Sequence, residues 1–117
     1  MATEVNLHVF RARNLFPVNR DGRTSDPRCS VTATAAKTSS SETTQTVYRT
    51  QVIRKDLNPT WNRVFTIPRS SILEFVVEDK EKSSILGTNS YQFMGKSNKL
   101  TVEELIKGGE QWIHLHH

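Results

Sequence analysis

Short segments in which apolar and polar residues alternate recur along the whole chain. A period of two places every second side chain on the same face and is typical of strands with one buried face. Turn-forming residues separate the segments, as at Asp21-Gly22, Asn58-Pro59 and Gly108-Gly109. The predicted strands cover residues 5–10, 29–34, 47–53, 64–67, 73–78, 91–93 and 112–115. Many short strands with frequent turns favour an antiparallel sandwich or barrel.

One helix is predicted near the C-terminus, over residues 101–107. Thr101 and Glu104 have the spacing of a capping box, in which each side chain accepts a hydrogen bond from the other residue's backbone N–H. Gly108 is suited to ending this helix in a left-handed conformation. The Ser- and Thr-rich stretch at residues 36–46 has few apolar residues, and we interpret it as a flexible loop between two strands.

The length of 117 residues fits a single domain, residues 1–117. Cys29 is the only cysteine, which excludes an internal disulfide and a multi-cysteine zinc site. No apolar run reaches the roughly 18 residues of a membrane-spanning helix, and the N-terminus lacks the apolar core of a signal peptide. We therefore expect a cytoplasmic protein, with peripheral attachment to a membrane left open.

The net charge of +4 is unevenly distributed along the chain. Residues 46–70 contain Asp56 as their one acidic residue and a set of basic ones, namely Arg49, Arg54, Lys55, Arg63 and Arg69. This segment is a candidate contact surface for anions such as lipid headgroups, and a solvated sheet face is the alternative. Nucleic acid is not the expected partner, because Trp61, Phe65 and Phe75 occupy predicted core positions and not a stacking face.

The sequence lacks the short motifs of common catalytic sites. It has no Gly-x-Ser-x-Gly elbow, no phosphate-binding loop and no His-Glu-x-x-His pair. His8 lies on the polar face of the first predicted strand, and Cys29 is expected to be a small buried residue. We therefore expect no catalytic residues and no enzymatic activity.

Three sequence motifs carry a resemblance to a known family. They are Thr24-Ser25-Asp26-Pro27, Leu57-Asn58-Pro59-Thr60-Trp61-Asn62, and Val77-Glu78-Asp79-Lys80-Glu81 followed by Leu86-Gly87. In this order and spacing they resemble the C2 domain, the lipid- and calcium-binding β-sandwich first known from protein kinase C. The resemblance covers nearly the whole chain. It implies an antiparallel Greek-key sandwich of seven to eight strands with one short helix near the C-terminus.

The resemblance also implies where calcium ligands would lie. Asp26, Asp79 and Glu81 match ligand positions in two loops, while Arg20 and Ser84 occupy two positions that are acidic in the family. Asp21, one residue from Arg20, is a candidate replacement. Positive charge at the same rim comes from Arg20, Arg23, Lys80 and Lys82. Because calcium affinity depends on the number of charged oxygen ligands, we expect weak calcium binding or none, and no other cofactor.

A second surface implied by the resemblance is a basic patch on the strand before Leu57-Asn58-Pro59, here Arg49, Arg54 and Lys55. It predicts a non-catalytic module that contacts anionic phospholipid or phosphoinositide membranes weakly and without calcium. The alternative is a protein-interaction or scaffold module that binds neither lipid nor calcium. The position of an eighth strand stays open: outside the chain, irregular around residues 92–99, or supplied by a partner at a sheet edge.

Overall fold

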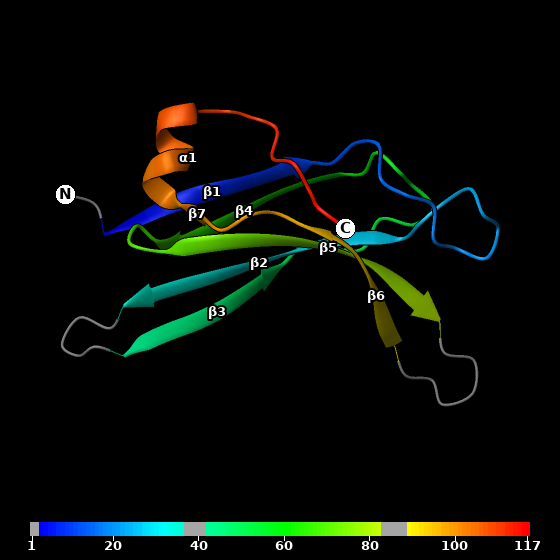
Figure 1. The fold of residues 1–117 in the computed structure, drawn as a ribbon, viewed down its shortest axis with the longest axis horizontal. Helices are drawn as coiled ribbons and strands as arrows, with labels where there is room; N and C mark the ends of the chain where they lie inside the picture. The colour runs from blue at the N-terminus through cyan, green and yellow to red at the C-terminus, as the bar shows by residue number, and fades with distance from the viewer. Residues whose placement is uncertain (1–2, 37–41, 83–88) are drawn as a thin grey trace.

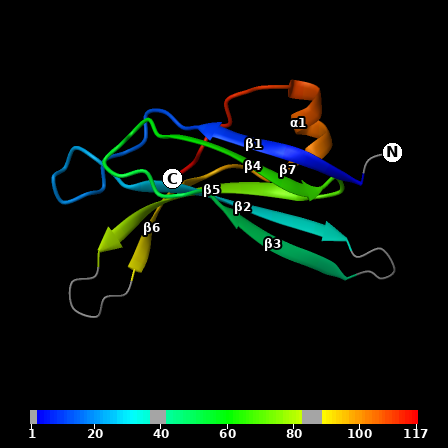
Figure 2. The ribbon, with the colours of Figure 1, turned by 180° about the vertical axis from the view of Figure 1, so that it is seen from behind.

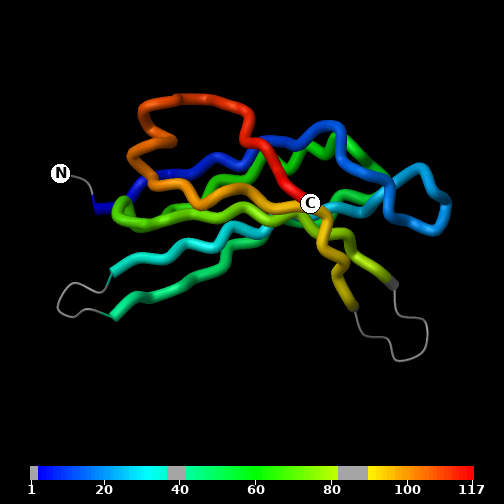
Figure 3. The backbone as a smooth tube through the Cα atoms, viewed as in Figure 1, coloured from blue at the N-terminus to red at the C-terminus, as the bar shows by residue number. Residues whose placement is uncertain are grey.

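The computed structural model describes residues 3–36, 42–82 and 89–117, which form two antiparallel sheets (Figures 1 and 3). The small sheet pairs β1 (Glu4–Arg11) with β4 (Thr60–Pro68). The large sheet has the order β3-β2-β5-β6, and a short strand β7 also pairs with β5. Its strands are β2 (Pro27–Ala36), β3 (Thr43–Arg49), β5 (Ile72–Lys82), β6 (Asn89–Lys96) and β7 (Leu100–Thr101). The predicted all-β sandwich is confirmed.

The core lies between the two sheets and consists of the alternate side chains that the sequence pattern predicts. In β2, for example, Cys29, Val31 and Ala33 are buried, whereas Thr32 and Thr34 between and beyond them are only half-buried. The core of described residues is Val9, Cys29, Val31, Ala33, Trp61, Phe65, Ile67, Leu73, Phe75, Val77, Met94 and Val102. Each sheet therefore turns one apolar face to the core. We call the opposite face of the large sheet its outer face.

The helix α1 (Val102–Gly108) begins as predicted. The Thr101 hydroxyl accepts from the Glu104 N–H, and the Glu104 carboxylate accepts from the Thr101 N–H, so the capping box is present. The left-handed C-cap is Gly109 and not Gly108. Within the described residues no helix has the length and apolar character needed to cross a membrane.

One predicted strand, one predicted loop limit and one predicted strand end differ from the structure. The segment 112–115 forms no strand, and a single bridge between Lys96 and His116 joins this part of the chain to β6. The loop expected over residues 36–46 is shorter, because Thr43–Thr46 belong to β3, where β-branched threonines fit a pleated strand. Residues 37–41 lie outside the described ranges.

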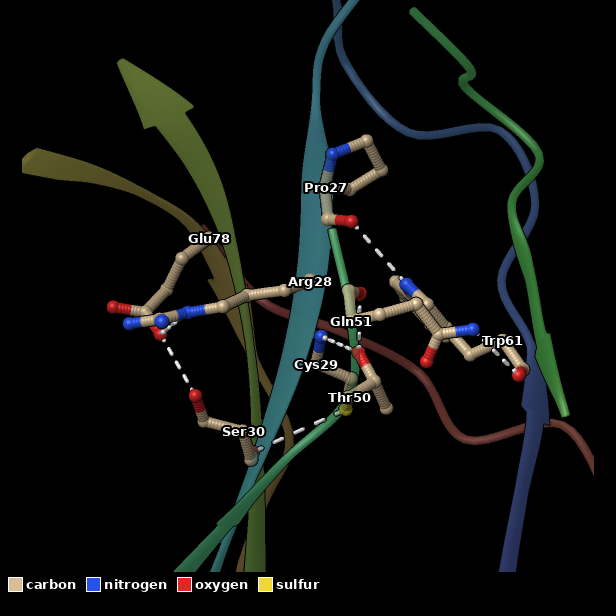
Figure 4. A network of polar contacts seen from close by, with 8 residues as sticks. All are labelled: Pro27, Arg28, Cys29, Ser30, Thr50, Gln51, Trp61 and Glu78. Atoms are coloured by element: carbon tan, nitrogen blue, oxygen red, sulfur yellow. Dashed lines mark hydrogen bonds and ion pairs between the residues drawn. The ribbon is translucent and has the colours of Figure 1, made fainter. Parts of the chain in front are cut away.

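The strand expected to reach Ile53 ends at Arg49, because the Thr50 hydroxyl takes the place of a backbone carbonyl in pairing with β2 (Figure 4). The Thr50 Oγ1 accepts from the Cys29 N–H at 2.9 Å and donates to the Gln51 carbonyl. The Thr50 N–H still donates to the Cys29 carbonyl at 2.9 Å, and further along the Ile53 N–H donates to the Pro27 carbonyl. A side chain thus satisfies the backbone donor that the strand would have satisfied.

Candidate functional site

The loop between β1 and β2 is fixed by a buried serine at the end of the molecule where the predicted ligands lie. Ser25 is fully buried, and its hydroxyl donates to the Phe16 carbonyl and accepts from the Val18 N–H. Two more hydrogen bonds tie the loop to the turn before β4: Leu15 N–H to the Leu57 carbonyl, and Asn14 N–H to the Asn58 side chain. The Asn58 side chain thus bridges the two loops.

Asp26 and Asp79 are brought together as the resemblance implies. The Asp26 N–H donates to Asp79 Oδ1 at 2.6 Å, and residue 79 is opposite Pro27 in the β2–β5 ladder. Asp26 Oδ1 itself accepts from the Lys55 N–H and from the Asn19 amide, both at 2.9 Å. Asn19 was missed by sequence reasoning, because its amide reaches Asp26 only through the fold of the loop. These bonds occupy one oxygen of each carboxylate.

Burial is the main influence on Asp79. Its side chain is 1% exposed, and burial raises the pKa of this carboxyl. The hydrogen bond from Asp26 lowers the pKa, but the negative charges of Asp26 and Glu81 raise it further. Glu81 is exposed, two residues along β5 from Asp79 on the same face. The ion pairs Arg28–Glu78 and Arg69–Glu103 do not involve these carboxylates.

Asp21 is directed toward its own turn. Its Oδ1 accepts from the backbone N–H groups of Arg23 and Thr24, and its Oδ2 accepts from the Thr24 hydroxyl at 2.6 Å. These bonds lower the pKa of Asp21, with a smaller contribution from the charge of Lys55. Asp21 is therefore the capping side chain of an Asx-type turn.

The predicted calcium ligands do not gather into a cluster of three within the described residues. Calcium requires six to eight converging oxygens, whereas no group of three metal-ligating side chains converges anywhere in residues 3–36, 42–82 and 89–117. Asp26, Asp79 and Asp21 each accept a hydrogen bond from at least one backbone N–H. Ser84, Leu86 and Gly87 lie outside the described ranges, as does the side chain of Lys82.

The predicted basic patch is divided between two places. Arg49 is the last residue of β3, whereas Lys55 is at the loop end, where its N–H meets Asp26. Arg54 is exposed in the same turn as Lys55. The remaining predicted rim residues, Arg20 and Arg23, are exposed in the β1–β2 loop, and Lys80 is half-buried in β5. Arg49 thus belongs to a sheet face, and Arg54 and Lys55 belong to the rim.

A basic residue that the sequence reasoning missed shares the outer face with Arg49. The ladders place Arg49, Ser30, Val76 and Lys96 opposite one another in one row across β3, β2, β5 and β6. Because residues paired across strands have side chains on the same face, Arg49 and Lys96 both lie on the outer face, about 14 Å apart by strand spacing. The alternation around residue 96 is broken by a bulge in the β5–β6 pairing, which hid Lys96 from the sequence pattern.

The middle of this face is electrically neutralised. Arg28 lies 3.4 Å from Glu78 and its guanidinium carbon is 3.3 Å from the centre of the Tyr91 ring. The Ser30 hydroxyl donates to the same Glu78 carboxylate at 2.8 Å (Figure 4). Arg28 is therefore committed to the sheet, which leaves Arg49 and Lys96 as exposed cations on either side of it.

Comparison with known proteins places this geometry in a family. The sequence matches the C2 domain over residues 3–115. The fold is similar to the RIM C2A domain from Drosophila, with 16% identity, a TM-score of 0.66, and coverage of 98% of this chain and 87% of that one. It is also similar to the C2A domain of plant extended synaptotagmin 1, with 27% identity, a TM-score of 0.61, and coverage of 87% and 70%.

A third similar structure contains calcium. The calcium-bound C2A and C2B domains of extended synaptotagmin 2 match with 18% identity and a TM-score of 0.63, over 91% of this chain and 36% of that one. No curated protein sequence matches this chain. The match over residues 3–115, together with the two antiparallel sheets and the Asp26–Asp79 pair, shows that the chain belongs to the C2 domain family.

Proposed function

We propose that this C2 domain attaches to anionic phospholipid surfaces through the outer face of its large sheet, without calcium. C2 domains are generally non-catalytic modules that contact membranes or proteins. The observation that carries the proposal is the row that holds Arg49 and Lys96, both exposed, on one face. Two cations at that separation can meet two headgroups of a flat anionic surface.

Exposed apolar side chains lie on the same face as these cations. Val47, two residues before Arg49 in β3, is 40% exposed. Phe93 pairs with Glu78 across the β5–β6 ladder, and its side chain is 49% exposed. Basic residues that draw a face to a membrane, combined with apolar residues that enter its interfacial layer, are the usual composition of a peripheral membrane surface.

The expected binding is weak and sensitive to salt. Each basic residue near an anionic membrane contributes about 1 kcal/mol, so the loss of Arg49 and Lys96 together should weaken binding roughly 30-fold. Exposed charges are screened beyond a Debye length of about 8 Å at physiological ionic strength, so raising the salt should release the domain. Calcium should have no effect, because the described carboxylates at the loop end do not converge on a cation site.

Co-sedimentation with vesicles tests the proposal. The vesicles contain either phosphatidylcholine alone or equal parts of phosphatidylcholine and phosphatidylserine, each with calcium or with a chelator, at two salt concentrations. We compare the double variant Arg49→Ala/Lys96→Ala with a control of equal charge, Arg54→Ala/Lys55→Ala, which alters the rim. Binding only to the anionic vesicles, with or without calcium, and lost in the first variant but not in the second, is the expected result.

Three outcomes contradict the proposal. If the wild-type domain ignores anionic vesicles at low salt, it has no membrane surface of this kind. Equal loss of binding in both double variants would mean that only total charge matters and that the sheet face has no special role. Binding that appears only with calcium would mean that the loop end, and not the outer face, attaches to the lipid.

A further inference from the structure

The strand β3 forms one edge of the large sheet. Among the described residues it pairs with β2 alone, and it is the outermost strand on its side of the sheet (Figures 1 and 2). Residues 43–47 are all exposed, so both faces of this half of the strand are open. The edge of such a strand offers backbone groups to another strand.

The backbone groups directed to this free edge belong to the odd-numbered residues of β3. The Thr50 N–H donates to the Cys29 carbonyl, so the hydrogen-bonded pairs of the β2–β3 ladder continue at even positions of β3. In an antiparallel ladder these pairs alternate with pairs that exchange no hydrogen bonds. The residues whose N–H and carbonyl groups are directed away from β2 are therefore Thr43, Gln45, Val47 and Arg49.

The strand β3 lacks the features that commonly protect an edge. Natural edge strands are blocked by charged side chains, prolines or bulges. Residues 43–48 include no charged residue and no proline, and the seven residue pairs of the β2–β3 ladder follow one another without a bulge. The β1–β4 and β5–β6 ladders, by contrast, each contain a register shift. The edge of β3 is therefore open to pairing over its whole length.

This edge is complementary to a second copy of itself. In an antiparallel ladder the groups directed outward from one strand meet those of the other, so an odd residue must face an odd residue. One register pairs all seven residues and places Thr46 opposite Thr46 on a two-fold axis. The other pairs are then Gln45 with Val47, Tyr48 with Thr44 and Arg49 with Thr43. The two Arg49 residues lie about 20 Å apart, so no like charges face each other.

We propose that two copies of this domain pair through β3 in that register on a membrane surface, an inference that rests on the proposed function. Residues that face each other across a ladder have side chains on the same side of the sheet, so the outer faces of both copies join into one surface. Arg49 and Lys96 of both copies then face the same anionic lipid. Two linked faces attach more strongly than one without any new kind of lipid contact.

The pairing should be weak in solution and favoured on a membrane. Stable protein complexes usually bury about 1,200–2,000 Å² of surface. We expect one strand from each copy to bury less than this, because only the edge of β3 is covered. Attachment through the outer face confines the domain to a surface and raises its local concentration, and association increases with concentration.

Disulfide crosslinking tests the pairing and its register. Because Thr46 faces its own counterpart, Thr46→Cys should bring two thiols within reach of a disulfide. Thr44→Cys is the matched control: it is exposed on the same face of β3, but its two copies would lie about 14 Å apart. The wild-type domain is the blank, since Cys29 is buried.

Each protein is treated with a mild oxidant in three settings. These are vesicles of equal parts phosphatidylcholine and phosphatidylserine, vesicles of phosphatidylcholine alone, and a concentrated solution without lipid. On the anionic vesicles we expect Thr46→Cys to form a linked dimer about tenfold faster than Thr44→Cys, which the geometry keeps beyond disulfide reach. The same preference should be present but slower in solution.

A second pair of variants tests the backbone hydrogen bonds. In the Thr46→Cys protein, Gln45→Pro removes an N–H that is directed to the free edge and leaves the β2 ladder intact, a position where proline is tolerated. Gln45→Ala is its matched control and keeps the N–H. Two hydrogen bonds are lost in each pair of copies, so Gln45→Pro should slow crosslinking about tenfold relative to Gln45→Ala.

Several results would overturn the inference, and they differ from a failure of the proposed function. Attachment to anionic vesicles without crosslinking of Thr46→Cys refutes the pairing and leaves the lipid surface in place. Equal crosslinking of Thr46→Cys and Thr44→Cys means random collision, and unchanged crosslinking in a folded Gln45→Pro variant excludes edge pairing. If the domain does not attach to vesicles, the proposed function fails and the solution experiment decides the pairing. If Gln45→Pro does not fold, the two cysteine positions decide it.

Discussion

Trp61→Ala is the sharpest test of how the core is built. Trp61 is 3% exposed, and its indole N–H donates to the Pro27 carbonyl at 3.2 Å (Figure 4). Truncating a buried tryptophan to alanine costs about 3–5 kcal/mol, because apolar contacts are lost and a cavity remains. Trp61 already borders an open cavity of about 1270 Å³ that is also lined by β1. The void left by the substitution joins that space, and we therefore expect a loss near 3 kcal/mol.

Trp61→Phe separates packing from the hydrogen bond. The Pro27 carbonyl also accepts from the Ile53 N–H, so removing the indole donor leaves it with one partner. The lost hydrogen bond should then cost about 1 kcal/mol, without the larger penalty of an unsatisfied buried group. We expect Trp61→Phe to lie between the wild type and Trp61→Ala, with most of the loss due to packing.

Urea unfolding followed by far-ultraviolet circular dichroism measures both variants. With a typical slope of about 1–3 kcal/mol per M, a loss of about 3 kcal/mol lowers the midpoint by roughly 1–3 M. Phe93→Ala, at a side chain that is 49% exposed, is the control and should change stability by less than about 0.5 kcal/mol. A midpoint for Trp61→Ala equal to that of the control would refute the assignment of Trp61 to the core.

Three further measurements check other parts of the structure. Because the folded pKa of Asp79 is raised, the folded state binds more protons than the unfolded state above pH 3.8, and stability should fall as pH rises from there through the folded pKa. Asp79→Asn keeps an acceptor for the Asp26 N–H but cannot titrate, so it should remove this contribution to the dependence of unfolding free energy on pH, measured by urea titrations at several pH values. An unchanged pH dependence in the variant would contradict the prediction. Calorimetric titration with micromolar calcium should show no binding heat, and a transition that Asp79→Asn abolishes would disprove the interpretation of the loop end. Thr101→Ala removes the capping box and should cost about 1 kcal/mol in thermal melts, whereas Thr101→Ser should restore most of it.

Local patterns predicted most of the architecture. The alternation in β2 and β5 places one set of side chains in the core, and the spacing of Thr101 and Glu104 locates the helix start. These features depend on residues close in sequence, so the sequence alone reveals them. The end of β3 could not be predicted, because the Thr50 hydroxyl competes with the backbone for a donor on another strand.

The candidate sites were predicted less completely because they depend on contacts between distant segments. The family motifs implied that Asp26 and Asp79 lie at the same end of the sandwich, and the structure has them in contact. They did not reveal the Asn19 amide or the Lys55 N–H that donate to Asp26. Lys96 lies on the same face as Arg49 because of the pairing in three successive strand ladders, one of which contains a bulge. This placement depends on residues far apart in the sequence. The alternation in residues 112–115 predicted a strand, but these residues form no strand in the structure. A cavity separates them from β1, so they have no neighbouring strand there with which to pair.

The β2–β3 hairpin has consequences for the dynamics of the domain. Near Arg49 it lies over the core, but residues 43–47 of β3 are exposed on both faces and depend on backbone pairing alone (Figure 1). Amide protons at this end should exchange with deuterium through local fraying, at free energies well below that of global unfolding. The amides of Cys29 and Val31, buried in the same hairpin, should exchange only when the whole domain opens. One pair of strands would thus contain both the most and the least protected amides of the large sheet.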